Sequence, residues 1–400
     1  MNSSLRNNSF LLLIIFVLVG LNLRPSMAAI GPLLNSIRDA IPLSYTLVSL
    51  LTMLPVFAMG IAMFIGIRLA DAIGEHRVVS VSLIFIALAS FFRLYATDSI
   101  NLLITAVVAG AGIAIIQAVI PKIIKSRFPN SIELYMGVYV TAIMGGAAVA
   151  ASSSPFIAEY FTSWRVGLSV WAGVAIFALL VWLSAKKLIS GNQPTENIKS
   201  VPEQQKTSFF KNRRAWILGL FFGLGTSSYT CVLAWLPPYY FDLGWQDKES
   251  GLILAYLTLM EVISGLIIPI IASRSKDRRW ILTFLLGCIV IGFIGLMLKP
   301  SEYALLWSGL LGIGIGGLFP MSLIVTMDHV SFPAKAGQLT AFVQGIGYIL
   351  ASLSPLLAGY IKDTYSSFSS AWAILATITC VMIFMAWRFK PAEYNLHFAE

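Results

Sequence analysis

Charged side chains are scarce in this chain, and acidic ones are scarcer than basic ones. Only 11% of the 400 residues are charged, and 18 Asp and Glu stand against 27 Lys and Arg, with three histidines and three cysteines. The histidines are widely separated, and Cys231, Cys288 and Cys380 lack the spacing of a metal or redox site. The sequence also shows no acidic cluster, no nucleophile paired with a base and no phosphate-binding loop. These absences argue against an enzyme, a metal site, a cofactor and ATP-driven transport.

Apolar residues, in contrast, are abundant. They make up 58% of the chain, and the mean hydropathy is +0.84, so in water the protein would expose too much apolar surface. Runs long enough to cross about 30 Å of hydrocarbon as helices recur about twelve times, and their continuity disfavours a membrane barrel. We predict an all-α integral membrane protein with about twelve transmembrane helices, near 9–34, 44–66, 77–96, 99–121, 135–160, 164–185, 214–240, 249–272, 279–298, 301–327, 335–361 and 368–389.

Two segments of the chain are variants of one sequence. MGVYVTAIMGGAAVAASSSPFIAEY, from Met136, and AGQLTAFVQGIGYILASLSPLLAGY, from Ala336, align without a gap at an offset of 200 residues. Internal duplication in an apolar chain is typical of transporters. Six predicted spans lie on each side of a polar segment that cannot form a core of its own. We predict two pseudo-symmetric six-helix bundles, 1–187 and 214–400, joined by a cytoplasmic linker, 188–213.

The basic residues follow the loops rather than forming one patch. If the N-terminus is cytoplasmic, about twenty of the 27 Lys and Arg fall on the inner side of the membrane. This is the positive-inside asymmetry, so we expect a multi-pass protein of the inner (plasma) membrane with both termini in the cytoplasm. Topology therefore explains the net charge of +9, and we expect no nucleic acid partner.

A loop and two helical segments resemble a known transporter family. RLADAIGEHR, from Arg68 to Arg77, is similar to the diagnostic loop of the major facilitator superfamily, with Ala70, Asp71 and Gly74 in place. GLNLRPSMAAIGPLL in the first span and GIAIIQAVIPKIIKSRF in the fourth resemble the cyanate porter family within it. That family includes proteins linked to cyanate and to nitroimidazole compounds. The resemblance implies two six-helix halves that alternately open a central cavity to the two sides.

The resemblance also gives the loop between the second and third spans a gating role, with Asp71, Gly74 and Arg77 as its residues. Asp71 would lie at the cytoplasmic end of the second helix, where it could pair with basic groups or exposed amides and latch one conformation. Ala72 and Glu75 stand where basic residues are usual, so we expect a weaker charge network. The alternative is a solvated carboxylate of little energetic weight.

Arg24 is the leading candidate for substrate contact. It lies about midway along the first predicted span, with no acidic residue within a turn. An arginine at the bilayer centre costs about 2.5–3.5 kcal/mol even on the lenient insertion scale, so it should face a wet cavity or a partner. Its planar guanidinium suits a small anion, which accepts two hydrogen bonds at once. Two alternatives stay open: a pairing that only holds helices together, and snorkelling to the interface.

Glu261 is the one acidic residue placed deep within a predicted span, the eighth. Without a partner, a buried carboxylate would bind a proton and could carry it, whereas pairing with Arg24 would keep it ionised. Helix packing with no transport role is the third possibility.

Other polar residues in the spans form a group of candidate substrate ligands. The resemblance implies that the first, fourth, seventh and tenth helices line the cavity, which favours Asn22, Gln117 and Tyr229. Gln344 and Tyr348 in the eleventh span complete the group. Any one of them could instead bond to a neighbouring helix, a contact worth about 0.6 kcal/mol.

These observations predict a secondary active transporter that works as a monomer among membrane lipids and moves a small anionic or polar solute, similar to cyanate, by alternating access. Importing one negative charge against an inside-negative potential costs about 2.3 kcal/mol per 100 mV, so uptake of an anion requires proton symport, exchange or a steep gradient. We expect proton coupling, and Glu261 is the only obvious proton carrier. The alternative is proton-driven efflux of neutral drug-like compounds such as nitroimidazoles, with Arg24 in a structural role. A receptor derived from a transporter is a third possibility.

Overall fold

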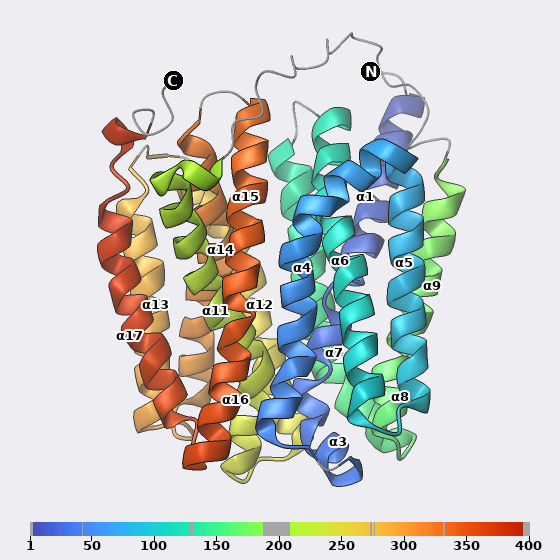
Figure 1. Ribbon diagram of the computed structural model, residues 1–400, viewed down its shortest axis with the longest axis vertical. Helices are drawn as coiled ribbons and strands as arrows, with labels where there is room; N and C mark the ends of the chain where they lie inside the picture. Colours follow the sequence, from blue (N-terminus) through green and yellow to red (C-terminus); the bar gives the residue numbers. More distant parts are fainter. Residues whose placement is uncertain are drawn as a thin grey trace.

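The protein is all α-helical in the part that the computed structural model describes. Twelve helical segments in this part are long and apolar enough to cross a membrane, six before and six after the predicted linker (Figure 1). The predicted all-α fold with twelve spans is therefore confirmed. Of the predicted linker, residues 188–208 lie outside the described residues. The described residues are 3–41, 43–128, 132–186, 209–272, 274–275, 277–330 and 333–394.

In the first half, polar residues cap the starts of long helices. The Ser44 side chain accepts a hydrogen bond from the Leu47 amide, and Asp98 accepts one from the Asn101 amide. Such caps satisfy amides that a helix start leaves without partners. The elements of this half are α1 (Ser3–Leu21), α2 (Pro25–Ala28), η1 (Gly31–Leu33), α3 (Leu34–Ala40), α4 (Tyr45–Ile73), α5 (Glu75–Phe92), η2 (Arg93–Tyr95), α6 (Ser99–Arg127), α7 (Ile132–Tyr160), α8 (Trp164–Ser169) and α9 (Trp171–Ser184).

The second half starts in the same way, because the Asn212 side chain accepts hydrogen bonds from the amides of Arg214 and Ala215. The longest helix of this half follows this cap directly. The elements of this half are η4 (Phe209–Lys211), α11 (Arg213–Asp242), α12 (Asp247–Ala272), α13 (Arg279–Leu298), α14 (Ala304–Asp328), α15 (Pro333–Ala351), α16 (Leu353–Tyr365), α17 (Ser369–Trp387) and η5 (Pro391–Glu393).

The eleventh span is interrupted at Ser352, between α15 and α16. Pro355 follows in the first turn of α16 and has no N–H to donate to the Ala351 carbonyl. Hydroxyl groups take over that role, because Thr230 and Ser354 both donate to this carbonyl at 3.1 Å. A helix break inside a membrane is tolerated where side chains satisfy the freed backbone group in this way.

The two halves meet along two equivalent pairs of helices. α7 of the first half packs on α12 of the second, and α15 and α16 of the second half pack on α4 of the first. Glycines allow the close approach: a Cβ added to Gly60 would lie 2.9 Å from the Gly345 carbonyl oxygen, and one added to Gly345 would lie 2.4 Å from the Phe64 ring. The first duplicated segment of the sequence thus supplies α7 to one contact, and the second supplies α15 and α16 to the other.

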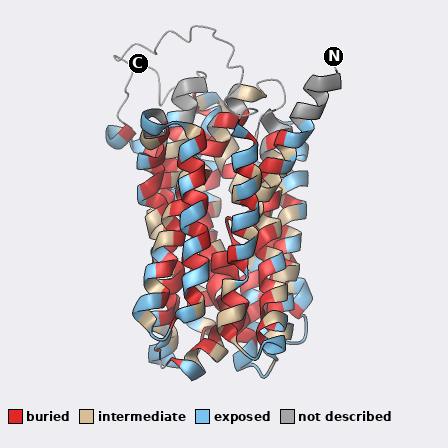
Figure 2. Cartoon of the chain, turned by 90° about the vertical axis from the view of Figure 1, so that its right-hand side faces the viewer, coloured by how far each residue is buried: buried red, intermediate tan, exposed pale blue. Residues whose placement is uncertain are grey.

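Apolar side chains occupy both the interior and the outer surface. Figure 2 shows buried residues on the inner faces of the helices and exposed ones on their outer faces. Large apolar residues are among the exposed ones, including Leu298 and Phe384, which are 74% and 75% exposed. A soluble protein would hide such side chains, whereas hydrocarbon tails solvate them.

Polar links join the halves at the end of the molecule opposite the two termini (Figure 1). Asp247, the first residue of α12, accepts hydrogen bonds from Asn35 and Ser36 of α3, both at 3.3 Å. The side chains of Lys248 and Glu159 form an ion pair nearby, between α12 and the end of α7. At this end the two bundles are therefore held together by polar contacts as well as by packing.

Candidate functional site

The first span is broken at the position of Arg24. α1 ends at Leu21 and α2 begins at Pro25, and Arg24 precedes α2 with φ −123° and ψ −23°. Proline is favoured at the first position of a helix, and it disfavours the helical conformation in the residue before it. The sequence Arg24-Pro25 therefore encodes the break, and the prediction of one uninterrupted span over 9–34 is wrong in this respect.

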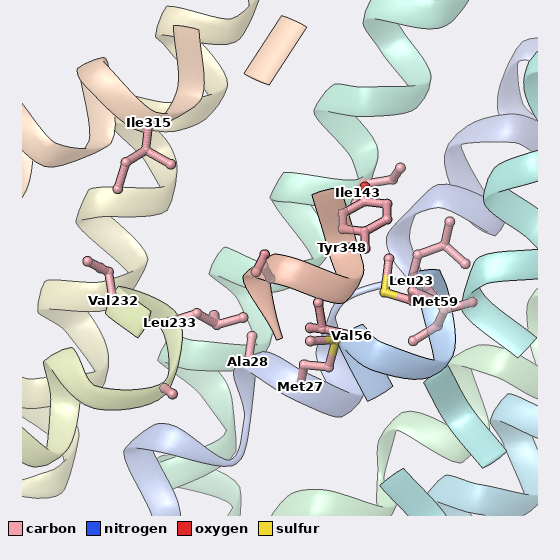
Figure 3. Packing of buried hydrophobic residues seen from close by; sticks show 14 of the residues in the cluster. Leu23, Met27, Ala28, Val56, Met59, Ile143, Val232, Leu233, Ile315 and Tyr348 are labelled. Atoms are coloured by element: carbon pink, nitrogen blue, oxygen red, sulfur yellow. The ribbon is translucent and has the colours of Figure 1, made fainter. Parts of the chain in front are cut away.

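Close packing on α7 fixes the end of α1 at this break. A Cβ added to Gly146 would lie 2.2 Å from the Leu21 carbonyl oxygen, so the two backbones touch. Figure 3 shows Leu23, Met27 and Ala28 of the broken span among buried side chains of α4, α7, α11 and α15. The segment that carries Arg24 is therefore embedded between both halves of the molecule.

The Arg24 side chain is 6% exposed and faces aromatic rings rather than a carboxylate. Its guanidinium carbon lies 5.1 Å from the centroid of the Tyr229 ring, a cation–π contact. The guanidinium also interacts electrostatically with the hydroxyl of Tyr348 and, more weakly, with Glu261. Within the described part of the chain it forms no ion pair, so the predicted salt bridge between Arg24 and Glu261 is not formed in this structure.

Arg24 lines a cavity of about 50 Å³ between the two halves. Space of this kind holds a few water molecules or a small ion, since one water needs about 10–15 Å³. Gln117 and Tyr229 lie in the same wall, and the first, fourth, fifth, seventh and tenth spans all contribute. The other lining residues are Val140, Ile143, Met144, Phe221, Phe222, Gly225, Thr226, Ile315, Leu318, Phe319 and Ser322.

Several buried polar atoms around this cavity have no hydrogen-bond partner in the structure. They include the side-chain carbonyl oxygen of Gln117, the hydroxyl of Tyr139 and both carboxyl oxygens of Glu261. Tyr139 of α7 interacts electrostatically with Arg24 and Tyr348, which places it in the same polar group. Buried polar atoms are nearly always hydrogen-bonded, so a concentration of free donors and acceptors beside a cavity marks a place where a polar ligand can bind.

Glu261 lies in the middle of α12 and is fully buried. Its backbone packs directly on α14, because a Cβ added to Gly316 would lie 2.3 Å from the Glu261 Cα. The carboxyl group does not line the cavity, but it interacts electrostatically with Arg24 and Tyr229 across it. The acid and the arginine thus lie in opposite halves and act on each other without contact.

Three candidate ligands lie outside the cavity wall. The Asn22 side-chain amide donates to the Leu18 carbonyl oxygen at 2.6 Å, which satisfies the end of α1 instead of a substrate. Gln344 lies half-buried on α15 and does not line the cavity. Tyr348 is buried beside Arg24 without lining the cavity directly.

The predicted gating residues lie at the end of the molecule that carries the termini, away from the cavity. Gly74 joins α4 to α5 with φ +90°, a conformation that favours glycine because a Cβ would be strained there. Arg77 is exposed in the first turn of α5. Asp71 belongs to the last turn of α4, and its side chain lies outside the described part, so the predicted latch stays a prediction.

Sequence reasoning missed Tyr139 and the aromatic wall formed by Phe221, Phe222 and Phe319. Tyr139 did carry a signal, because the equivalent position of the second repeat is Leu339 and the substitution of a polar residue was therefore visible. The phenylalanines carried none, since a chain with 25 of them gives no indication of which ones face inward.

Comparison with known proteins agrees with this architecture. A family model described as Major Facilitator Superfamily matches residues 10–355. The chain is 36% identical to the cyanate transport protein CynX of Escherichia coli (strain K12), over 96% of this chain and 98% of that protein. It is 26% identical to the 2-nitroimidazole transporter of the same organism, with 94% of each chain covered.

The fold is also similar to that of solved transporters. A D-xylose-proton symporter superposes with a TM-score of 0.79 at 14% identity, covering 95% of this chain and 97% of the other. At such low identity the likeness concerns the fold alone. Together, the helix arrangement, the family model and the relative at 36% identity show that this chain is a multi-pass secondary transporter rather than an enzyme, and that it belongs to the Major Facilitator Superfamily, in the family of the cyanate transport protein.

Proposed function

We propose that this protein moves a small anion similar to cyanate across the inner membrane by alternating access, with Arg24 as the principal anion ligand. The observation that carries the proposal is a buried guanidinium that lines a cavity and has no carboxylate partner among the residues that the structure describes. Burying an uncompensated charge is costly, so a site that retains one must recover the cost through function. An anion bound in the cavity would supply the missing counter-charge.

The size and composition of the cavity support a small solute with both polar and apolar parts. A volume of about 50 Å³ accommodates an ion of a few atoms. Gln117, with its free carbonyl oxygen, and Tyr139, with its free hydroxyl, offer hydrogen bonds beside Arg24. Phenylalanines of α11 and α14 also line the cavity, and apolar surroundings strengthen electrostatic attraction at the site.

Glu261 is the proposed proton carrier. Its carboxyl group is fully buried, and in the described part of the chain neither of its oxygens has a hydrogen-bond partner. Burial without a partner disfavours the charged form of a carboxyl group. An anion at Arg24 would cancel the positive field that acts on Glu261 and so promote its protonation. Anion and proton would then bind together, which makes uptake of the anion electrically neutral and removes the cost of about 2.3 kcal/mol per 100 mV.

Uptake of radiolabelled cyanate into proteoliposomes under an imposed proton gradient tests the proposal. We expect gradient-stimulated uptake by wild type, and a fall in uptake efficiency of about 100-fold in Arg24→Ala, because a two-pronged, charge-assisted contact is lost. Arg24→Lys should retain a part of the affinity, since the charge stays but the planar fork is lost. Glu261→Gln should still exchange cyanate but should no longer respond to the gradient.

The matched control is Arg165→Ala, which removes an arginine that donates to the Ala96 carbonyl oxygen outside the cavity. It should transport as wild type does. Uptake that persists unchanged in folded Arg24→Ala would refute the role of Arg24, and absence of cyanate uptake by wild type would move the proposal to its alternative.

That alternative is proton-driven efflux of neutral compounds such as nitroimidazoles. The aromatic wall favours it, because Phe222 and Phe319, with ring centroids 5.6 Å apart, offer flat surfaces on which a heteroaromatic ring stacks. The 2-nitroimidazole transporter at 26% identity gives it further support. Efflux of labelled 2-nitroimidazole that survives Arg24→Ala would favour this function over anion uptake.

We also propose that both termini face the cytoplasm. The structure has both at one end, and the clusters of basic residues beside them fit the positive-inside rule (Figure 1). Two reporter domains fused to the C-terminus test the orientation, one active only in the cytoplasm and one active only outside the membrane. Activity of the second reporter would show that the C-terminus lies outside.

A further inference from the structure

Arg93 is a second buried cation of the first half, and the proposed transport cycle gives it no role. It begins the short turn η2 after α5, and its side chain is 2% exposed. It does not line the cavity, and no acidic side chain in the described ranges pairs with it. A buried guanidinium is retained at such cost only where its hydrogen bonds matter.

Its hydrogen bonds go to the broken first span and to α6. Nη1 of Arg93 donates to the carbonyl oxygen of Ser26 at 2.7 Å, and Nε donates to the hydroxyl oxygen of Thr105 at 3.3 Å. The Thr105 hydroxyl in turn donates to the Leu102 carbonyl oxygen at 2.7 Å, which orients the hydroxyl so that its oxygen can accept from Arg93. Arg93 is thus anchored on α6 and reaches across to α2.

The Ser26 carbonyl needs this donor because α2 ends at Ala28 and the usual backbone donor is missing. In a continuous helix the amide of Ile30 would donate to it, but that amide donates to the Met27 carbonyl oxygen at 3.2 Å. A buried carbonyl left without a donor would cost free energy comparable to a lost hydrogen bond. Arg93 supplies a charge-assisted bond in its place, and such bonds are roughly twice as strong as neutral ones.

We infer that Arg93 is a positioning residue for the substrate site: it holds the one-turn helix α2 at a fixed place and so sets the position of Arg24, two residues before Ser26. The inference rests on the proposed role of Arg24 as anion ligand. Arg93 itself touches no substrate. It acts through the backbone, since α2 has only four residues and too few internal hydrogen bonds to hold its own place.

The test measures transport kinetics and local backbone opening in the same variants. In Arg93→Met, the KM for cyanate should rise about tenfold while the maximal rate changes by less than about twofold, because the charge-assisted bond to the Ser26 carbonyl oxygen is lost and the position of Arg24 is loosened. Hydrogen–deuterium exchange of the amides in 22–30 should become about tenfold faster, with exchange in 213–240 unchanged. Arg93→Lys should recover most of both effects, since an ammonium group can still donate to the carbonyl.

Arg165→Met is the matched control, because Arg165 also donates to a backbone carbonyl oxygen, at 2.7 Å, but to that of Ala96 and not to one in the broken span. It should leave the KM and the exchange of 22–30 as in wild type. If Arg93→Met does not fold, Thr105→Val decides, because it removes one anchor of Arg93 and keeps the charge; we expect a rise in KM of about threefold.

Unchanged KM and unchanged exchange in Arg93→Met, or in Thr105→Val where the first does not fold, would overturn the inference. The hydrogen–deuterium exchange measurement tests the positioning role of Arg93 independently of the proposed role of Arg24. If Arg24→Ala transports cyanate normally while Arg93→Met still opens 22–30, the anion-ligand role fails and the positioning of α2 stands. If Arg24→Ala abolishes uptake and both readouts of Arg93→Met equal those of wild type, the function stands and the positioning role fails.

Discussion

Arg24 carries a fixed positive charge and lies beside aromatic side chains. Arg24 has the Tyr229 ring at 5.1 Å and the hydroxyl of Tyr348 nearby, so its charge is partly compensated without a carboxylate. Such partial compensation leaves the guanidinium able to attract an anion, whereas a salt bridge with Glu261 would have neutralised it. The proposed anion site therefore requires that this ion pair be absent, as it is among the described residues.

The Tyr229 ring should contribute through its face rather than through its hydroxyl group. Tyr229→Phe keeps the cation–π contact with Arg24, so we expect the KM for cyanate to stay within about twofold of wild type. Tyr229→Leu loses the contact, worth up to about 2 kcal/mol when desolvated, and the KM should rise about tenfold or more. Uptake kinetics in proteoliposomes give both values. Equally large defects in Tyr229→Phe and Tyr229→Leu would show that the hydroxyl group, and not the ring, makes the contribution.

At the scale of elements, the site depends on how the broken first span is held. α1 ends on the backbone of α7, α2 begins at a proline, and the Ser26 carbonyl is held from η2 and α6 through Arg93. No single helix of the first half determines where Arg24 lies. Three neighbours restrain the break, which makes it a rigid feature rather than a flexible joint.

Two adjacent glycines of α7 allow a matched test of this packing. A Cβ added to Gly146 would lie 2.2 Å from the Leu21 carbonyl oxygen, whereas one added to Gly145 would have its nearest neighbour, Leu21 Cδ2, at 3.9 Å. We expect Gly146→Ala to destabilise the protein by about 2 kcal/mol and to lower cyanate uptake, because the break must move. Gly145→Ala should be close to neutral.

Thermal unfolding in detergent, followed by size-exclusion chromatography of the soluble fraction, measures the stability of both glycine variants. Uptake assays on the same preparations measure the effect on the site. Equal melting temperatures for Gly145→Ala and Gly146→Ala would contradict the close contact between α1 and α7.

The sequence predicted some of these elements well and others poorly, for physical reasons. Length and apolarity define a transmembrane helix, so the number and place of the spans followed from hydropathy alone. The rotation of each helix about its axis is not encoded in hydropathy when apolar residues cover all its faces. Asn22 and Gln344 were therefore grouped with Arg24 although they point elsewhere, and Tyr139 was missed. The break at Arg24-Pro25 was readable from the proline, but the helical span assumed over 9–34 obscured it.

At the scale of the whole molecule, contact between the bundles decides which end can open. The end opposite the termini is joined by Asn35 and Ser36 to Asp247, by Lys248 to Glu159, and by packing of η1 on α11. These links cross from one half to the other, so rocking of the halves must break them when this end opens. The total strength of these links contributes to the free-energy difference between the state closed at this end and the state open at this end.

Removing the carboxylate of Asp247 should shift that balance. In a variant whose native cysteines are replaced by serine, Thr226→Cys places a thiol in the cavity wall, and a membrane-impermeant thiol reagent applied opposite the termini reports opening at that end. Adding Asp247→Ala should speed labelling about threefold to fivefold, because two interhalf hydrogen bonds are lost. The control is Asp277→Ala, which removes a carboxylate that accepts hydrogen bonds from Arg279 of its own half. Equal labelling rates for the Asp247 and Asp277 variants would argue against a latch at this end.

The contacts of α7 with α12 and of α4 with α15 and α16 are equivalent in the two halves, and they bear on why the two halves carry different charged residues. Because the fifth helix of each half meets the second helix of the other, a lone six-helix unit of this design is self-complementary and would pair with a copy of itself about a twofold axis. In such a homodimer every charged residue of the site would be present twice, once in each copy. Joining the units in one chain removes that restriction: the residue 200 positions after Arg24 is Leu224, and the one 200 positions before Glu261 is Ile61. In the function that we propose, the first half supplies the anion ligand and the second half supplies the proton carrier.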